Sequence, residues 1–270
     1  MARYGMVSLC FLIGCKAVDP APEDFDALMY YFWNHADTGA DARLIDAIQN
    51  LDIAVESGTL QEATDGSLTP LSPEEAAIAQ HTRDPAQAAG IYLLNPFVCT
   101  VDSLTALILH LDQQSVYPGV YDTYTRSYTG SREDFLAYKT HRLGWALDYG
   151  ATVLGTSYTA TTQSTFRRIS MEEQENPWPH GDILLWKVFL TDPADFGNSG
   201  KSLTQDYQID LYFPYEDRII HAYGIWREGN YGTGFTTDTE AVQRITLNNL
   251  EKWDRGTEEL CLTGVPEPTL

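Results

Sequence analysis

The sequence predicts an α+β protein, and the order of its local patterns is the main evidence. Helical patterns come first, a series of strand patterns follows, and one long helical pattern closes the chain. Such segregation is typical of an antiparallel sheet with helices packed on it. At 270 residues and 43% hydrophobic content, the chain can bury a full core. We expect a helical region over 25–115 and a sheet with a C-terminal helix over 116–264, together forming one domain.

Helical periodicity is clear at three places in the first half. Apolar residues recur there at steps of three and four. Between the first two helices, Gly39 provides a stop and Asp41 a cap, while Asp102 or Ser103 caps the third. The repeating positions are Phe25, Leu28, Met29 and Phe32, then Leu44, Ala47, Ile48 and Leu51, then Leu104, Leu107, Ile108 and Leu111.

Strand patterns dominate the second half. Residues 120–128 and 151–169 are rich in Thr and Tyr with few helix formers, and 183–190 is an apolar run typical of a buried strand. Apolar and polar residues alternate in 207–213, and a turn joins this segment to 218–227. These last two segments predict a β-hairpin.

The segment 133–148 is ambiguous, and a helix is predicted at the C-terminal end of the chain. Residues 133–148 fit both a capped helix and a strand face, and we favour a strand. Asp238 caps the final helix, which carries Val242, Ile245 and Leu250 on one side.

The order of elements, with helices first, then strands and a long last helix, is similar to the helix-grip arrangement of START-like lipid-binding proteins, where a curved sheet wraps the last helix around an apolar cavity. The resemblance lies in element order alone.

The first fifteen residues have the layout of an export signal. Arg3 supplies a positive charge, and an apolar run from Tyr4 to Ile13 follows it. The run is too short to span a bilayer as a helix. It ends in Leu12-Ile13-Gly14-Cys15, which resembles the lipobox of bacterial lipoproteins.

In that family the bond before the cysteine is cut and its thiol carries a diacylglycerol. The resemblance implies a signal peptide over 1–14, a lipidated Cys15 and a tether over 15–24. It also implies a bacterial cell envelope location, and Lys16 after the cysteine favours the outer membrane. The alternative is a buried N-terminal strand with a core cysteine.

The charge balance excludes one class of partner. The chain has 38 acidic and 17 basic residues, a net charge of -21 and a pI of about 4.4. Such a surface repels phosphate backbones, so we expect no nucleic acid partner. Membrane contact is expected through the lipid anchor. The remaining partners are a small apolar ligand or an envelope protein.

Two cysteines remain outside the signal, Cys99 and Cys261. In an exported chain an even pair predicts a disulfide. The alternative is two separate buried thiols. Neither cysteine belongs to a CxxC motif, and no histidine pair has zinc-site spacing, so we expect no metal and no cofactor.

Motifs for catalysis are few. The string Asp37-Thr38-Gly39-Ala40-Asp41 resembles the catalytic motif of aspartic proteases, but it follows a helical pattern and has no second copy. We interpret it as a turn. No Gly-x-Ser-x-Gly motif is present.

Five residues are candidates for ligand contact. Trp178, His180 and Asp182 lie in a loop before the strand at 183–190, and such loops can bind ligands. His221 and Tyr223 alternate on the second strand of the hairpin, so both belong to one face.

The leading hypothesis is therefore an exported, lipid-anchored, non-catalytic protein that binds a small or apolar ligand, or a partner protein, through an aromatic sheet. One alternative is an envelope hydrolase that assembles His180, Asp182 or His221 into a site in three dimensions. Another is a structural component of the envelope.

Overall fold

The computed structural model describes residues 20–54, 64–79 and 83–264. Within these ranges, eight antiparallel strands form one sheet in the order β1-β2-β8-β7-β6-β5-β4-β3. The strands are β1 (Thr64–Leu68), β2 (Ala89–Phe97), β3 (Thr123–Tyr128), β4 (Arg142–Val153), β5 (Thr156–Ile169), β6 (Ile183–Leu190), β7 (Ser202–Tyr215) and β8 (Arg218–Asn230). Each strand pairs antiparallel with its neighbours.

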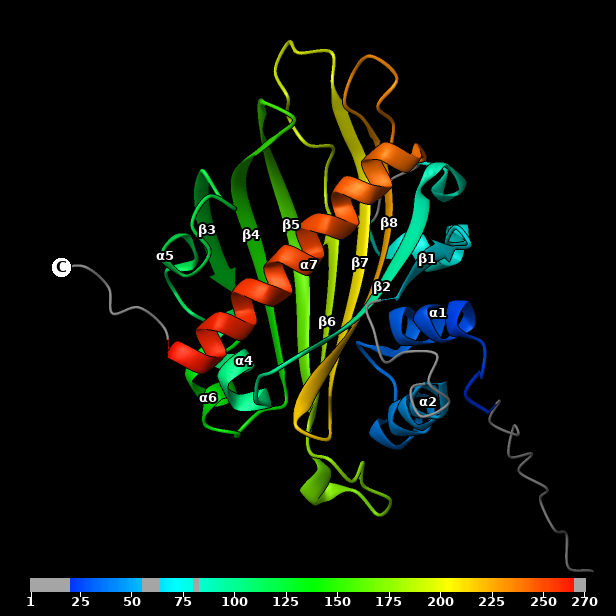
Figure 1. Ribbon diagram of the computed structural model, residues 1–270, viewed down its shortest axis with the longest axis vertical. Coiled ribbons are helices and arrows are strands. Elements are labelled where there is room, and N and C mark those ends of the chain that lie inside the picture. Colours follow the sequence, from blue (N-terminus) through cyan, green and yellow to red (C-terminus); the bar gives the residue numbers. More distant parts are fainter. Residues whose placement is uncertain (1–19, 55–63, 80–82, 265–270) are drawn as a thin grey trace, which may run out of the picture.

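Helices cover both faces of this sheet. The α-helices are α1 (Phe25–His35), α2 (Asp41–Ala54), α3 (Pro73–Ala76), α4 (Val101–Ile108), α5 (Gln113–Val116), α6 (Arg132–Leu136) and α7 (Glu240–Thr263), with 3-10 turns at Ala77–Ala79, Pro85–Gln87 and Met171–Glu173. Figure 1 shows α7 running diagonally across one face, from the side of β1 and β2 toward α4. We call this the α7 face and the opposite one the α1 face. A sheet with a long C-terminal helix across it is the helix-grip arrangement, so the α+β prediction is confirmed.

The core on the α1 face follows from strand alternation. Tyr207, Ile209 and Leu211 point to that face from β7, because side chains two residues apart share a side of a strand. Phe32 and Trp33 of α1 are fully buried against them. These strands are covered on both faces, which explains why few of their residues are exposed.

The string 37–41, which resembles a protease motif, is the turn between α1 and α2, as the sequence predicted. Its two carboxylates attach the helices to the sheet. Asp37 accepts from Lys187 Nζ at 2.8 Å, and Asp41 pairs with Arg167. Lys187 also lies 4.2 Å from the centre of the Trp33 ring. These contacts give the two carboxylates a structural role.

The C-terminal helix is fixed to the rest of the fold at its far end. Cys261 forms a disulfide with Cys99, and their Cα atoms are 5.3 Å apart. The ring of Tyr117 stacks on Trp253 with ring centres 5.3 Å apart. No helix in the described part of the chain has the length and apolar character required to cross a bilayer.

Two sequence expectations differ from the structure. The region 25–115, expected to be helical, also supplies β1 and β2, and β2 lies between β1 and β8 in the sheet. The segment 133–148, for which a strand was favoured, is mixed: Ser131 caps α6, and β4 begins only at Arg142. The lipobox, Cys15 and the first half of the tether, 15–19, lie outside the described residues.

Candidate ligand-binding site

A cleft of about 190 Å³ lies between α7 and the sheet. Its α7 side presents Ile245 and Leu250, and Leu154 closes it at the β4–β5 turn. Its floor comes from β7 and β8 and includes Gln208 and Tyr223. The full lining is Val153, Leu154, Gln208, Tyr223, Arg227, Tyr231, Val242, Ile245, Thr246, Asn249 and Leu250. One side of the cleft is therefore largely apolar, and the other is polar and aromatic.

The polar floor of the cleft is held in place by an ion pair. Arg227 Nη2 donates to Asp206 at 2.8 Å, and Gln208 Nε2 donates to the same carboxylate oxygen at 2.8 Å. Asp206 is only 2% exposed, so the pair is shielded from water. Because the guanidinium and the carboxylate satisfy each other, this pair offers a ligand a rigid surface rather than a free charge.

Next to the cleft, a buried histidine connects α7 to the sheet. His221 Nδ1 lies 2.8 Å from Asp254 on α7, and Nε2 lies 2.9 Å from Asp210 on β7. Asn95 Nδ2 donates to the other oxygen of Asp254 at 2.7 Å. None of the three ionisable groups is more than 5% exposed. The cluster therefore attaches the middle of α7 to β2, β7 and β8.

This environment decides the charge of His221. Burial alone lowers the pKa of the imidazole, but the carboxylates of Asp254 and Asp210 outweigh it and raise the pKa to about 9. Burial raises the pKa of Asp210, which the hydrogen bond from His221 opposes. At neutral pH His221 is an imidazolium with both N–H groups donated to carboxylates. His221 therefore has a structural role, joining α7 to the sheet, and neither of its nitrogens is free for proton transfer.

Further along the α7 face, across β3 to β6, five buried polar atoms have no hydrogen-bond partner among the described residues. They are Tyr124 Oη, Arg126 Nε, Trp145 Nε1, Ser164 Oγ and Trp186 Nε1. We call these residues the donor patch. Unpartnered buried polar groups are uncommon in folded proteins and call for an explanation.

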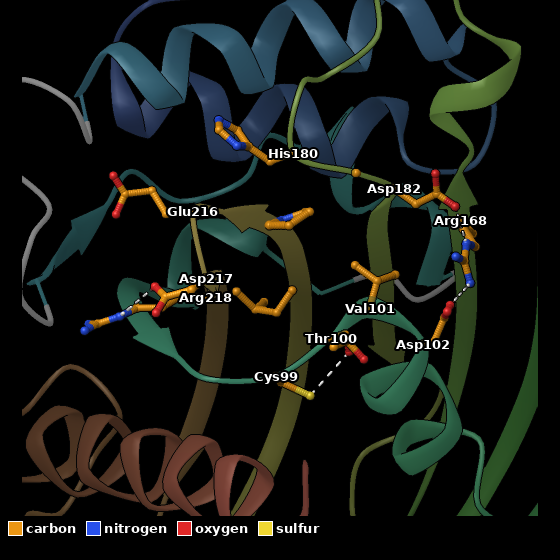
Figure 2. A pocket seen from close by; sticks show the side chains of 13 residues that line it. Cys99, Thr100, Val101, Asp102, Arg168, His180, Asp182, Glu216, Asp217 and Arg218 are labelled. Carbon is orange, nitrogen blue, oxygen red and sulfur yellow. Dashed lines mark hydrogen bonds and ion pairs between the residues drawn. The ribbon is translucent and has the colours of Figure 1, made fainter. Parts of the chain in front are cut away.

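A second pocket, of about 370 Å³, lies at the end of the sheet near the β7–β8 turn (Figure 2). Arg168 lies between two carboxylates there, 2.7 Å from Asp182 and 2.9 Å from Asp102. Two acidic partners neutralise this arginine, so it is not available to an anion. His180 lines the same pocket, and its ring lies 5.4 Å from that of Tyr215.

A third hollow, of about 420 Å³, lies on the opposite side of the sheet and has mostly hydroxyl and carboxylate side chains around it. Thr123, Thr125 and Asp148 belong to this lining. In the described ranges, no group of three or more His, Cys, Asp or Glu residues has the geometry to hold a metal ion.

The sequence-predicted candidates are divided among different places. His180 and Asp182 meet in the pocket at the end of the sheet, whereas His221 and Tyr223 lie under α7. Trp178 is in neither: it is 2% exposed in the core of the α1 face, and its Nε1 donates to the carbonyl of Pro214 at 2.8 Å.

The sequence analysis missed Asp210, Asp254 and Arg126. Asp254 could have been found from the sequence, because it lies seven residues after Leu247 and therefore on the apolar side of the last helix. An acidic residue on such a side requires a partner from the sheet. Arg126 is a charged residue between Tyr124 and Tyr128 on one side of its strand, whereas Asp210 falls on a polar position of the alternation in 207–213 and gave no such signal.

No protein-family model matches the chain, and no curated protein matches it. Among solved structures, a START superfamily protein from Mycobacterium smegmatis is 11% identical, with a TM-score of 0.40, over 64% of this chain and 97% of that one. The human StarD13 lipid transfer and protein localization domain is 7% identical, with a TM-score of 0.44, over 78% and 95%.

The Zhui aromatase/cyclase from Streptomyces is 8% identical, with a TM-score of 0.41, over 66% of this chain and 96% of that one. Sequence identities and TM-scores this low carry no information about the activity of the chain. The fold assignment rests on the strand order and on the position of α7.

Proposed function

We propose that this chain is an exported, lipid-anchored protein that binds a small apolar or amphiphilic molecule between α7 and the sheet. The observation that carries the proposal is the cleft of about 190 Å³ under α7. Ile245, Leu250 and Leu154 give it an apolar side, while Gln208 and Tyr223 give it a polar floor. Ligand sites commonly combine apolar walls with a few fixed polar groups.

The rigid surroundings of the cleft support a binding role. His221 and the disulfide hold α7 in place at two points, so the cleft is formed before a ligand arrives. Pre-formed sites bind with a smaller ordering cost than flexible ones. A partner protein or a purely structural role would not require a cleft under α7.

The export part of the proposal rests on the lipobox resemblance at Cys15. The disulfide between Cys99 and Cys261 supports it, because structural disulfides persist mainly in oxidising compartments. A lipid at Cys15 would place the binding fold beside a membrane, where apolar ligands are available.

The hydrolase alternative has less support from the geometry. His221 is 1% exposed and has both nitrogens bonded to carboxylates, so it cannot act as a base toward a substrate. His180 lines a pocket, but the neighbouring carboxylate of Asp182 is bonded to Arg168 and to the backbone N–H of Met171.

The test uses the neutral fluorescent probe N-phenylnaphthylamine, with dodecanol as a competitor. We expect saturable fluorescence enhancement that dodecanol reverses. Ile245→Trp should fill the cleft and abolish binding, whereas Asn248→Trp, at an exposed position of the same helix that does not line the cleft, should leave it unchanged. Absence of saturable binding, or equal binding by both variants, would contradict the proposal.

A further inference from the structure

The residues of the donor patch are neighbours on the α7 face of the sheet, and each has a buried polar atom. Trp145 pairs with Ser164 across β4 and β5, and the Trp145 and Trp186 ring centres are 5.7 Å apart. The guanidinium carbon of Arg126 lies 4.7 Å from the centre of the Trp145 ring and 5.3 Å from that of Tyr124. Five unpartnered atoms in one neighbourhood point to a shared missing partner.

The chemistry of these atoms identifies what that partner must supply. The two indole N–H groups and the guanidinium N–H can only donate, while the hydroxyls of Tyr124 and Ser164 can donate or accept. Trp145 is fully buried and Ser164 is 5% exposed, so bulk water does not satisfy them. The partner therefore has to carry hydrogen-bond acceptors.

Arg126 adds a charge without a counter-charge. Arg167, Arg168 and Arg227 on the same sheet all pair with an aspartate. Among the described residues, no ion pair within 4.0 Å involves Arg126, although the chain as a whole has a net charge of -21. The two geometric hydrogen bonds of Arg126 both leave from Nη1, to the carbonyl of Ile108 and to the hydroxyl of Tyr128, and its Nε has no partner among the described residues. The guanidinium also interacts with the Tyr124 hydroxyl, where it opposes the rise in pKa that burial causes.

The patch also continues the floor of the cleft. Ser164 pairs with Val188, and Val188 pairs with Gln208, which lines the cleft. In the next row, Trp186 pairs with Asp210, and Asp210 with Tyr223, which lines it too. Residues paired across strands share a face of the sheet, so the donor patch and the floor of the cleft lie on the same face, a few strands apart.

We infer that the molecule bound under α7 is an elongated amphiphile with a carboxylate end group. Its carboxylate lies against Arg126 and accepts from the neighbouring N–H groups, while its apolar part extends into the cleft. A single arginine without a second cation matches one negative charge, which favours a carboxylate over a phosphate dianion. This inference rests on the proposed binding function and adds the class of ligand.

The test compares dodecanoate with dodecanol, which have the same chain and differ only in the end group. Arg126→Gln should weaken dodecanoate binding about 10- to 100-fold, the range expected for losing a charge-assisted hydrogen bond, and should leave dodecanol binding unchanged. The control is Arg132→Gln, because Arg132 Nε also donates to a carbonyl at the end of α4, that of Leu109. It should change neither affinity.

A measurement on the unaltered protein covers the case in which Arg126→Gln does not fold. Carbon NMR of carboxyl-labelled dodecanoate follows the pKa of the bound acid. A nearby guanidinium should lower this pKa below that of the free acid, whereas burial without a cation would raise it. A raised pKa would overturn the inference.

The outcomes separate the two proposals. If neither dodecanol nor dodecanoate binds the unaltered protein, the binding function fails and this inference fails with it. If dodecanol binds and Arg126→Gln weakens both ligands equally or neither, Arg126 does not hold the end group of the ligand. The carboxylate inference is then wrong while the binding function stands.

Discussion

Raising the pH should lower the free energy of unfolding of this protein, because His221 loses its proton. Its pKa is raised from 6.5 to about 9 by Asp254 and Asp210, despite the opposing effect of burial. A group whose pKa is higher in the folded state stabilises the fold fully below its unfolded pKa and loses this contribution as the pH rises through its folded pKa. The stabilisation should therefore be complete below about pH 6.5 and be lost by about pH 9. At 1.36 kcal/mol per pKa unit, the loss is ~3 kcal/mol.

Other groups around His221 do not titrate in this window. Tyr212 and Tyr223 contact its ring, and burial raises the pKa of both well above the usual value. Trp253 and Asn95 carry no ionisable group. The change between pH 6.5 and 9 therefore reports on the imidazolium and its two carboxylates.

The assay is urea unfolding at a series of pH values, with His221→Gln as the comparison. At pH 7 the variant should be less stable by ~3–5 kcal/mol, because two carboxylates are left buried without their cation. It should also lack the loss of stability between pH 6.5 and 9. Equal pH dependence in both proteins, or an NMR pKa for His221 near 6.5, would refute the reasoning.

Three further predictions concern the disulfide, a buried ion pair and the processing of the N-terminus. Replacing both Cys99 and Cys261 by serine should destabilise the fold by up to ~5 kcal/mol, as chain entropy gives for a closed loop with a sequence separation of 162; equal unfolding midpoints with and without reductant would contradict this. Asp37→Ala should cost ~3 kcal/mol because Lys187 is buried, and Lys187→Met in that background should restore most of it; a double variant no more stable than Asp37→Ala in urea would count against it. In a bacterial host, intact mass should show loss of residues 1–14 and a lipid on Cys15, with detergent partitioning abolished by Cys15→Ala; an unprocessed chain would remove the export proposal.

The sequence predicted the elements whose evidence is local. The alternation in 207–213 and 218–227 became β7 and β8, and the periodicity after Asp238 became α7. In contrast, β1 and β2 were missed. Strand β2 pairs with a strand far along the chain, where Asn95 faces His221 of β8, and β1 belongs to the sheet only through β2. The short apolar run over 91–94 gives no sign of a partner more than a hundred residues away.

In the candidate site, too, the residues found from the sequence are those with a local pattern. His221 and Tyr223 were singled out from their alternation, and both lie under α7. The partners of His221 come from another strand and from the final helix, so no spacing rule connects them. The role inferred for Arg126 depends on its having no carboxylate partner among the described residues, which only three-dimensional neighbours can show.

The most direct test of the account is to locate a bound ligand. Amide correlation spectra of the labelled protein, titrated with dodecanol, report which residues sense the ligand. We expect saturable shifts centred on Ile245, Gln208 and Tyr223. Shifts confined to the pocket around His180, or no saturable shifts at all, would contradict a binding site under α7.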